Sequence, residues 1–389
     1  MTKRHDNNMP ISPKKFMHEL WRYKRGSVTR RHFLGVTGLG MATAVMASAM
    51  PSLLRSGKAH AATDIGDRVS IATWPNYFNR DNYEAFTKQT GAHIQVSVFG
   101  SNEEMLAKLQ AGGTGWDVFV PTNYTISTYQ DLDLIQPLDL SRLPNFDPKY
   151  YVKRFMEPGT IDGVVYAVPK NWGTTGFVVN RNKIGSNPTS WKEFWNLAKG
   201  DASGRVIVHD YQLTTIGNAL VSLGYSFNSI DPNELAEAEE LLLEVKPHLF
   251  AITSDYQPGM RSGDAWMSIA WVGDGLQLHR DLPEIDYVLG DEGGELWSDF
   301  YAIPKSAPRP DAAYALINYL LDPAVNAREA EAHGYPVADE RSLEFLPESI
   351  TENPIVYPAR EELEPLEFGA AVTLTSERRA ELMARFKAA

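Results

Sequence analysis

Short apolar segments alternate with helical patterns along residues 69–120. Three of these segments have the composition and length of strands: Val69–Thr73, Ile94–Phe99 and Asp117–Val120. The first helical pattern covers residues 82–90 and is followed by Gly91, which tolerates the left-handed geometry of a helix end. The second follows a capping pair formed by Ser101 and Glu104. This βαβαβ order predicts an α/β fold in which helices cover both faces of a mainly parallel sheet.

A second set of strand and helix patterns begins near Phe177. Its predicted strands and helices are Arg205–Val208, residues 231–245, Met267–Trp271, Asp311–Leu321, Ala324–Ala332 and a last helix from Ser376. The chain has 389 residues, which is more than one hydrophobic core usually serves. We therefore expect two lobes, joined by crossings near residues 172–179 and 297–304.

The first 61 residues have the features of an export signal. Residues 27–34 read Ser-Val-Thr-Arg-Arg-His-Phe-Leu, and this paired arginine resembles the twin-arginine signal. A diluted apolar run, Val36–Leu54, follows, and Ala59-His60-Ala61 offers a cleavage site. We predict that residues 1–61 are a twin-arginine signal peptide and that the protein is periplasmic. A retained membrane anchor is the alternative, because the apolar run approaches the ~20 residues that span a bilayer.

The charge is distributed unevenly between this leader and the rest of the chain. The leader holds eleven Lys and Arg against two Asp and Glu, a balance of +9 within a total of −12, which leaves −21 for residues 62–389. An acidic body disfavours nucleic acid and anionic membranes as partners, and it favours cations in its clefts. The chain has no cysteine, which excludes disulfides, thiolate metal sites and a cysteine nucleophile.

Enzyme motifs are absent from the sequence. It contains no Gly-x-Ser-x-Gly elbow, no phosphate-binding Gly-x4-Gly-Lys-Ser/Thr loop and no His-Glu-x-x-His pair. His209 beside Asp210 is the one pair suited to acid–base work, and a structural histidine at a strand end is the alternative. We expect no catalytic residues, no cofactor and no metal site.

Aromatic residues and isolated carboxylates recur just beyond predicted strands or in a crossing. They are Trp74, Tyr77, Tyr124, Trp271 with Asp274, and Trp297 with Asp299. In open α/β sheets, ligands bind beyond the carboxyl ends of the strands. An aromatic face attracts a cation by roughly 0.5–2 kcal/mol, and a buried ammonium also needs a carboxylate partner. The pattern therefore predicts one cleft for a small cationic amine.

Several stretches resemble bacterial periplasmic spermidine/putrescine-binding proteins. The longest, residues 100–121, reads GSNEEMLAKLQAGGTGWDVFVP. Further matches are Trp172–Gly176, Thr189–Trp191, Leu223–Ser226, Ser254–Asp255, Ala302–Pro304, Ile317–Pro323 and Gly334–Pro336. The resemblance covers nearly the whole chain after Arg68. It implies a two-lobed periplasmic-binding-protein fold (type 2), with each lobe a mainly parallel sheet flanked by helices.

The resemblance also implies lobe boundaries and partners. We expect residues 62–172 plus 302–340 in lobe 1, and residues 173–301 plus 341–389 in lobe 2. Members of the family close around a polyamine and deliver it to the membrane permease of an ATP-driven ABC importer, without catalysis. We expect this protein to do the same as a monomer.

The family's ligand-contacting positions correspond to particular residues of this chain. They are Trp74, Tyr77, Thr122, Tyr124, Ser254, Trp271, Asp274, Trp297, Asp299 and Tyr335. One segment departs from the pattern: the family's Asp-Asp-x-Arg-Glu reads Asp210-Tyr-Gln-Leu-Thr214 here, so that Tyr211 and Thr214 replace two amine-holding carboxylates. This change favours a smaller or monocationic amine over full-length spermidine. A ferric ion held by tyrosines and an exported cofactor enzyme are the alternative interpretations.

Overall fold

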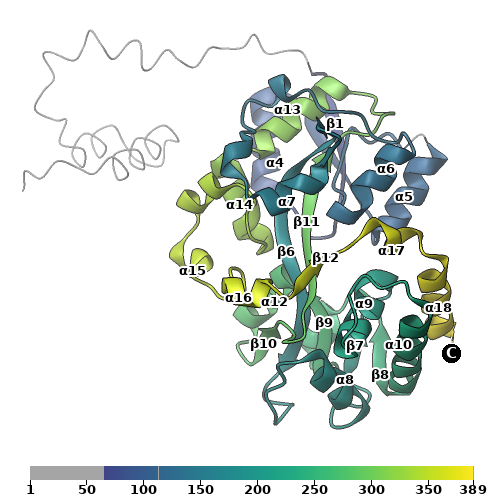
Figure 1. Ribbon diagram of the computed structural model, residues 1–389. Helices are drawn as coiled ribbons and strands as arrows, with labels where there is room; N and C mark the ends of the chain where they lie inside the picture. Colours follow the sequence, from purple (N-terminus) through teal and green to yellow (C-terminus); the bar gives the residue numbers. More distant parts are fainter. Residues whose placement is uncertain (1–64, 113, 389) are drawn as a thin grey trace, which may run out of the picture. The chain divides into compact units, whose positions relative to one another are not determined.

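A ten-stranded mixed sheet runs through the part of the chain that the computed structural model describes, residues 65–112 and 114–388 (Figure 1). The predicted signal peptide lies outside these residues. The strand order is β2-β1-β3-β11-β6-β9-β7-β8, with β10 paired to β6 and β12 to β11. The strands are β1 (Arg68–Thr73), β2 (His93–Val98), β3 (Val118–Phe119), β6 (Ala167–Asn180), β7 (Val206–Val208), β8 (Leu249–Ile252), β9 (Met267–Trp271), β10 (Ile285–Val288), β11 (Gly294–Ala302) and β12 (Leu366–Phe368).

The sheet is parallel at its two ends and antiparallel in its middle. At one end β1 pairs in parallel with β2 and β3, and at the other β7 pairs in parallel with β8 and β9. The long strands β6 and β11 pair antiparallel with each other, and β6 also pairs antiparallel with β9 and β10. Figure 1 shows β6 and β11 running between the two groups of helices. The α/β class predicted from the sequence is therefore confirmed, whereas the antiparallel pairing of β6 with β9, β10 and β11 was not part of the predicted, mainly parallel sheet.

Most helices begin and end where the sequence signals them. The longer ones are α4 (Arg80–Thr90), α5 (Asn102–Ala111), α8 (Trp191–Lys199), α9 (Gln212–Ser222), α10 (Pro232–Val245), α12 (Val272–Asp281), α13 (Pro310–Leu320), α14 (Pro323–His333) and α18 (Glu377–Ala388). Ser101 caps α5 through the amide of Glu104, as the sequence predicts. Gly91 and Gly334 end α4 and α14 with φ of 82° and 81°, which glycine adopts without strain. Within residues 65–112 and 114–388, none of the helices has the length and apolarity to cross a membrane.

Two large apolar clusters form the core. The first joins β1 to α4 and α13 through Val69, Phe86 and Ile317. The second joins β7 to α9, α10 and α18 and includes Leu220 and Phe386. Five of the predicted ligand residues belong to or pack against the first cluster: Trp74, Tyr77, Trp271, Trp297 and Tyr335. Tyr124 and Tyr211 belong to or pack against the second.

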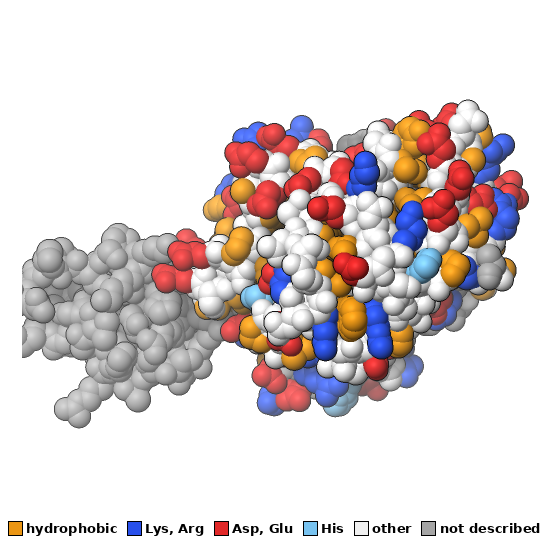
Figure 2. Space-filling model, turned by 90° about the horizontal axis from the view of Figure 1, so that it is seen from below, with side chains coloured by type: hydrophobic (Ala, Val, Ile, Leu, Met, Phe, Trp, Pro, Cys, Tyr) orange, Lys and Arg blue, Asp and Glu red, His pale blue; other side chains and the backbone are white. Residues whose placement is uncertain are grey.

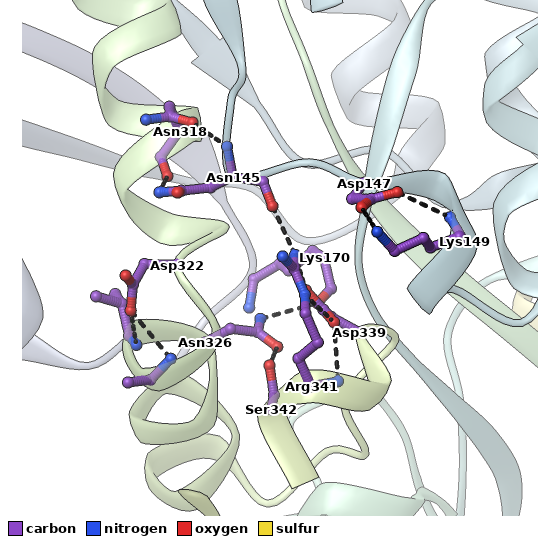
Figure 3. A network of polar contacts seen from close by, with 12 residues as sticks. Asn145, Asp147, Lys149, Lys170, Asn318, Asp322, Asn326, Asp339, Arg341 and Ser342 are labelled. Atoms are coloured by element: carbon purple, nitrogen blue, oxygen red, sulfur yellow. Dashed lines mark hydrogen bonds and ion pairs between the residues drawn. The ribbon is translucent and has the colours of Figure 1, made fainter. Parts of the chain in front are cut away.

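A polar network fastens the segment after α14 to the start of β6 (Figure 3). Arg341 forms an ion pair of 2.6 Å with the buried Asp339 and donates to the carbonyl of Asn145 at 2.6 Å. Asn326 of α14 donates to the carbonyl of Lys170 at 3.2 Å. Buried hydrogen bonds of this kind hold the backbone of β6 in place next to the cavity described below.

Candidate functional site

A cavity of about 690 Å³ lies among the strand ends of the sheet. The predicted ligand residues that line it are Trp74, Tyr77, Thr122, Tyr124, Tyr211, Ser254, Trp271, Asp274, Trp297, Asp299 and Tyr335. The structure thus brings together all the predicted positions except Thr214. On the face of the molecule seen in Figure 2, acidic and basic side chains are interspersed, whereas several carboxyls of the cavity are buried.

The fold places these side chains by simple rules of strand geometry. Trp74 follows β1, Thr122 follows β3, and Trp271 is the last residue of β9. Successive residues of a strand point to opposite faces, so Trp297 and Asp299 of β11 share one face. The indole of Trp297 lies across Gly173 of β6, where a Cβ on that glycine would come within 2.4 Å of the ring. Gly173 therefore leaves the space that this indole occupies.

Asp299 is the most enclosed of the predicted carboxylates, with 4% of its surface exposed. Its Oδ2 lies 2.8 Å from the hydroxyl of Tyr77, which also lies 2.7 Å from Oδ1 of Asn171. Its Oδ1 is buried and has no hydrogen-bond partner within residues 65–112 and 114–388. Burial raises the pKa of Asp299 to about 7, although hydrogen bonds and Lys170 oppose the shift. Oδ1 therefore has acceptor capacity left for a ligand, although Thr122, which forms a β-bridge with Asp299, also lowers the pKa of this carboxyl.

Lys170 is a buried lysine that interacts electrostatically with this carboxylate, and sequence reasoning missed it. Its Nζ is 4.1 Å from the centre of the Tyr77 ring, on the β6 side of the site. Burial lowers the pKa of Lys170 to about 8, while Glu329 and Asp299 act in the opposite direction. The available signal was a single lysine in an otherwise uncharged run, Val168-Pro-Lys-Asn-Trp172. This pattern does not show which groups the amino group of Lys170 faces.

Asp274 occupies a more open position in the first turn of α12. It is half-buried, and the hydroxyl of Tyr335 lies 3.5 Å from its Oδ1. Burial raises its pKa, and hydrogen bonds from Tyr256 and Gln257 oppose that shift. This carboxylate retains more contact with solvent than Asp299 does.

The segment that departs from the family pattern contributes one cavity residue. Tyr211 lines the cavity, with its ring centre 6.4 Å from that of Trp271. Thr214 does not: it is fully buried on α9, and its hydroxyl lies 2.9 Å from Nδ1 of His209. The expectation that Thr214 faces the ligand is therefore wrong, because α9 turns this side chain toward His209.

His209 is also unsuited to the acid–base role considered from the sequence. Burial lowers the pKa of its imidazole to about 3, so the ring is neutral near pH 7. The neighbouring Asp210 instead accepts a hydrogen bond of 2.5 Å from Ser254. The ring stacks near Tyr211 and Tyr256, with centres 5.5 and 5.4 Å away, which is the position of a structural histidine.

Glu295 is a second buried carboxylate in the cavity that sequence reasoning missed. It is 3% exposed, and its Oε2 accepts a 2.5 Å hydrogen bond from Thr175 of β6. Burial raises its pKa to about 8, and the charge of Asp299 adds to the shift. The signal was present as Glu295-Leu-Trp-Ser-Asp299, in which alternate residues share a face.

A cavity of aromatic and carboxylate side chains at the strand ends of an α/β sheet is typical of a protein that binds a small ligand. Residues 82–358 match the model of the bacterial extracellular solute-binding proteins, and the chain belongs to this family. The resemblance found in the sequence is thus confirmed at the level of the family.

Curated relatives agree with this assignment. The chain is 30% identical over 336 residues to spermidine/putrescine-binding periplasmic protein 1 of Haemophilus influenzae, covering 85% of this chain and 91% of that protein. It is 32% identical over 335 residues to the spermidine/putrescine-binding periplasmic protein of Escherichia coli, covering 83% and 94%. The putrescine-binding periplasmic protein SpuD of Pseudomonas aeruginosa is 31% identical over 316 residues, with coverage of 77% and 85%.

Solved structures agree as well. A putative spermidine/putrescine ABC transporter protein of Listeria monocytogenes aligns with a TM-score of 0.76 at 30% identity, covering 83% of this chain and 99% of that chain. PotD of Streptococcus pneumoniae aligns with a TM-score of 0.70 at 29% identity, with the same coverage. The fold is therefore that of the two-lobed periplasmic binding proteins, and these relatives are transport proteins.

Proposed function

We propose that the protein captures a cationic amine of the putrescine/spermidine kind and passes it to the membrane permease of an ABC importer. The observation that carries the proposal is the buried Asp299 carboxyl, whose Oδ1 lacks a partner within the described residues. An ammonium group satisfies such an oxygen and is itself stabilised by it, whereas an uncharged ligand brings no charge to pair with the carboxylate. The names of the curated relatives support the same class of ligand.

In the proposed complex one ammonium group lies against Oδ1 of Asp299. Trp271 and Trp297 flank the methylene chain that follows, since aromatic faces offer both apolar contact and attraction for a cation. Asp274 contributes a weaker charge because it is half-buried. The ligand is held and released, and no residue is assigned a catalytic role.

We further propose that closure involves two lobes, residues 62–172 plus 302–340 and residues 173–301 plus 341–389. The strands β6 and β11 carry the chain near the proposed boundaries, and ligand residues lie on both sides of them. A ligand that contacts both lobes stabilises the closed state by its differential affinity. Small-angle scattering with and without ligand tests this: a smaller radius of gyration on binding is expected, and an unchanged radius contradicts closure.

For export we propose the twin-arginine route and a monomeric periplasmic protein. The support is the Arg30-Arg31 pair followed by His-Phe-Leu. Replacing both arginines by lysine keeps the charge but removes the receptor-read pair, so precursor is expected to remain in the cytoplasm. Periplasmic protein at the wild-type level would exclude this route.

A tyrosine-held ferric ion is the second ligand considered. Within residues 65–112 and 114–388, no group of three or more His, Cys, Asp or Glu is arranged to hold a metal ion. Burial also raises the pKa of Tyr77, Tyr124 and Tyr211 well above its usual range, which favours their protonated form. A coloured preparation after incubation with ferric citrate would support iron over amine.

The direct test is calorimetric titration of purified protein with putrescine, spermidine, a monoamine and an uncharged diol of putrescine's length. Binding of one or more amines without binding of the diol is expected. Equal affinity for the diol, or no binding of any amine, contradicts the proposed function.

A further inference from the structure

The strand β11 presents a carboxylate at each end of one five-residue segment. Glu295, Trp297 and Asp299 all line the cavity and, being two residues apart in turn, lie on the same face of the strand. Their partners on β6 are Thr175, Gly173 and Asn171 in regular antiparallel register, and the irregularity of this pairing comes only after Asp299. The segment therefore places Glu295, Trp297 and Asp299 in a row on the face of β11 that lines the cavity.

The two carboxylates act on different groups of cavity residues. Burial is the main cause of the raised pKa of Tyr77, and the charge of Asp299 is the second. The charge of Asp299 also raises the pKa of Tyr335. For Tyr211, burial is the main cause of the raised pKa and the charge of Glu295 is the second. We name the group of Asp299, Tyr77 and Asn171 the Asp299 end, and the group of Glu295, Thr175, Tyr211 and Tyr124 the Glu295 end.

Glu295 thus lies near the position where the sequence had suggested that an anchor was lost. Tyr211 stands where the sequence pattern of the resembling proteins has a carboxylate, yet Glu295, a buried carboxylate of β11, acts on this same tyrosine. Thr175 is the single side-chain donor to Glu295 within the described residues, and one hydroxyl leaves most of the acceptor capacity of a carboxylate unused.

We propose that Glu295 is the second ammonium anchor of the site, and that the site takes an extended polyamine whose terminal cations are bound by Asp299 and Glu295. This proposal rests on the proposed function and specifies its ligand. It replaces the sequence-based preference for a small or monocationic amine, because the charge missing at Tyr211 and Thr214 is supplied from β11.

The spacing selects the length of the ligand. A strand rises 3.2–3.4 Å per residue, so residues four apart are separated by roughly 13 Å. With bonds of about 1.5 Å, an extended amine chain advances about 1.25 Å per bond, which separates the terminal nitrogens of putrescine by about 6 Å and those of spermidine by about 11 Å. With the carboxylates at this backbone spacing, a triamine of spermidine length lying along the strand comes within hydrogen-bond reach of both. A four-carbon diamine spans only about 12 Å even with a hydrogen bond of about 2.9 Å at each end, and falls short.

The intervening Trp297 suits the middle of such a chain. Its indole is held over Gly173 and is 6% exposed, so that it offers a fixed face between the two charges. Its Nε1 is buried without a partner within the described residues. Methylene groups and an internal secondary ammonium are both compatible with an aromatic face.

The test compares Glu295→Gln with Glu103→Gln by calorimetric titration of spermidine, putrescine and a monoamine. Gln keeps the acceptor for Thr175 and removes only the charge. Glu103 is the matched control, because it also acts on Tyr124 and Tyr211 but does not line the cavity. We expect Glu295→Gln to weaken spermidine by at least thirtyfold while putrescine and the monoamine change by less than threefold, and Glu103→Gln to change none of them by more than threefold.

A second measurement needs no variant. Linear α,ω-diamines with four to nine methylene groups are titrated into the wild-type protein, and affinity is expected to rise to a maximum near eight methylenes. An affinity that is flat or falls beyond four, or equal losses for spermidine and putrescine in Glu295→Gln, overturns the second anchor while leaving amine binding intact. If the wild-type protein binds no amine at all, the proposed function itself fails and this assignment falls with it.

Discussion

The Asp299 end and the Glu295 end of the cavity hold their carboxylates in different surroundings. Asp299 lies beside the hydroxyl of Tyr77, and a buried lysine, Lys170, is close enough to oppose the rise of its pKa. Lys170 is in turn influenced by Glu329. Glu295 has the hydroxyl of Thr175, and among residues 65–112 and 114–388 no cation is a cause of its pKa shift. Asp299 therefore loses its proton at a lower pH than Glu295, and the ionised form of Glu295 depends more strongly on the cation of a ligand.

The difference shows how far a family's sequence pattern predicts the carboxylates of a binding site. The Asp299 end follows the pattern, since its Trp-x-Asp spacing is unchanged. The Glu295 end departs from it, and the charge comes from a different element. The loss of carboxylates at Tyr211 and Thr214 therefore does not determine the charge of the cavity. That charge depends on all the elements that line the cavity, and β11 contributes Glu295.

The largest effect is expected when the Asp299 end is broken. Asp299→Asn removes the charge but keeps the shape, and breaking a buried charge pair typically costs ~3–5 kcal/mol, about a hundredfold to a few thousandfold in affinity. Calorimetry should show this loss for spermidine, putrescine and the monoamine alike. Unchanged affinity for all three would place the ammonium elsewhere.

The second prediction uses pH to separate the two ends. Burial raises the pKa of Asp299 to about 7 and that of Glu295 to about 8, and each must lose its proton to bind a cation. Affinity should therefore fall as the pH is lowered from 8 to 6, because protonation of a carboxylate costs about tenfold in affinity per pH unit below its pKa. Lys170, with a pKa of about 8, gains its proton over the same range and repels the ligand further.

Spermidine should show the steeper dependence, since it engages both carboxylates, and putrescine the shallower one. Amines of this kind stay protonated across the range, because the pKa of an unperturbed alkylammonium such as Lys is about 10.4. Calorimetry at pH 6, 7 and 8 measures both slopes. Parallel slopes for the two amines contradict a second anchor, and affinity that rises toward pH 6 contradicts carboxylate anchoring at either end.

Much of the fold could be predicted because its signals are local. The strands of the first βαβαβ unit, the cap at Ser101 and the helix end at Gly334 depend on neighbouring residues only. The helix α9 was not predicted. Ten of its eleven residues are buried, polar Gln212, Thr215 and Asn218 among them, so it lacks the exposed polar face that usually marks a surface helix. The helix α12 was not predicted either, since Gly273 and Gly275 in its first turns read as a loop.

Site residues that directly follow a strand could be predicted from the sequence. Charged site residues inside strands could not, because the sequence does not show that they are buried. Trp74, Trp271 and Asp299 were found because strand ends converge in an α/β sheet. Lys170 and Glu295 were missed, because charged residues within strands are normally solvated and their burial depends on elements far away in the sequence. Thr214 was misplaced because the prediction assigned it by alignment, without the helix that turns it inward.

A smaller effect is expected from Asp274, which is more exposed than both Asp299 and Glu295. Asp274→Asn removes a charge that is half-buried and near the hydroxyl of Tyr335. Water screens such a charge, so the loss of affinity should stay below about tenfold for every amine. Titration beside Asp299→Asn makes the comparison direct. Losses as large as those of Asp299→Asn would make Asp274 a main anchor.

The smallest effect is expected from Tyr211→Phe, and its size tests what holds the ligand at the Glu295 end. Burial, followed by the charge of Glu295, raises the pKa of Tyr211 well above its usual range, so its hydroxyl is neutral at any pH used for binding. A neutral hydroxyl can accept one hydrogen bond from an ammonium, which is worth about 0.5–1.5 kcal/mol, whereas the ring remains to pack near Trp271. Affinity for spermidine should therefore fall by no more than about tenfold, clearly less than in Glu295→Gln, and affinity for putrescine should not change. If Tyr211→Phe weakens spermidine more than Glu295→Gln does, the tyrosine itself is the second anchor, and the row of charges along β11 does not set the length of the ligand.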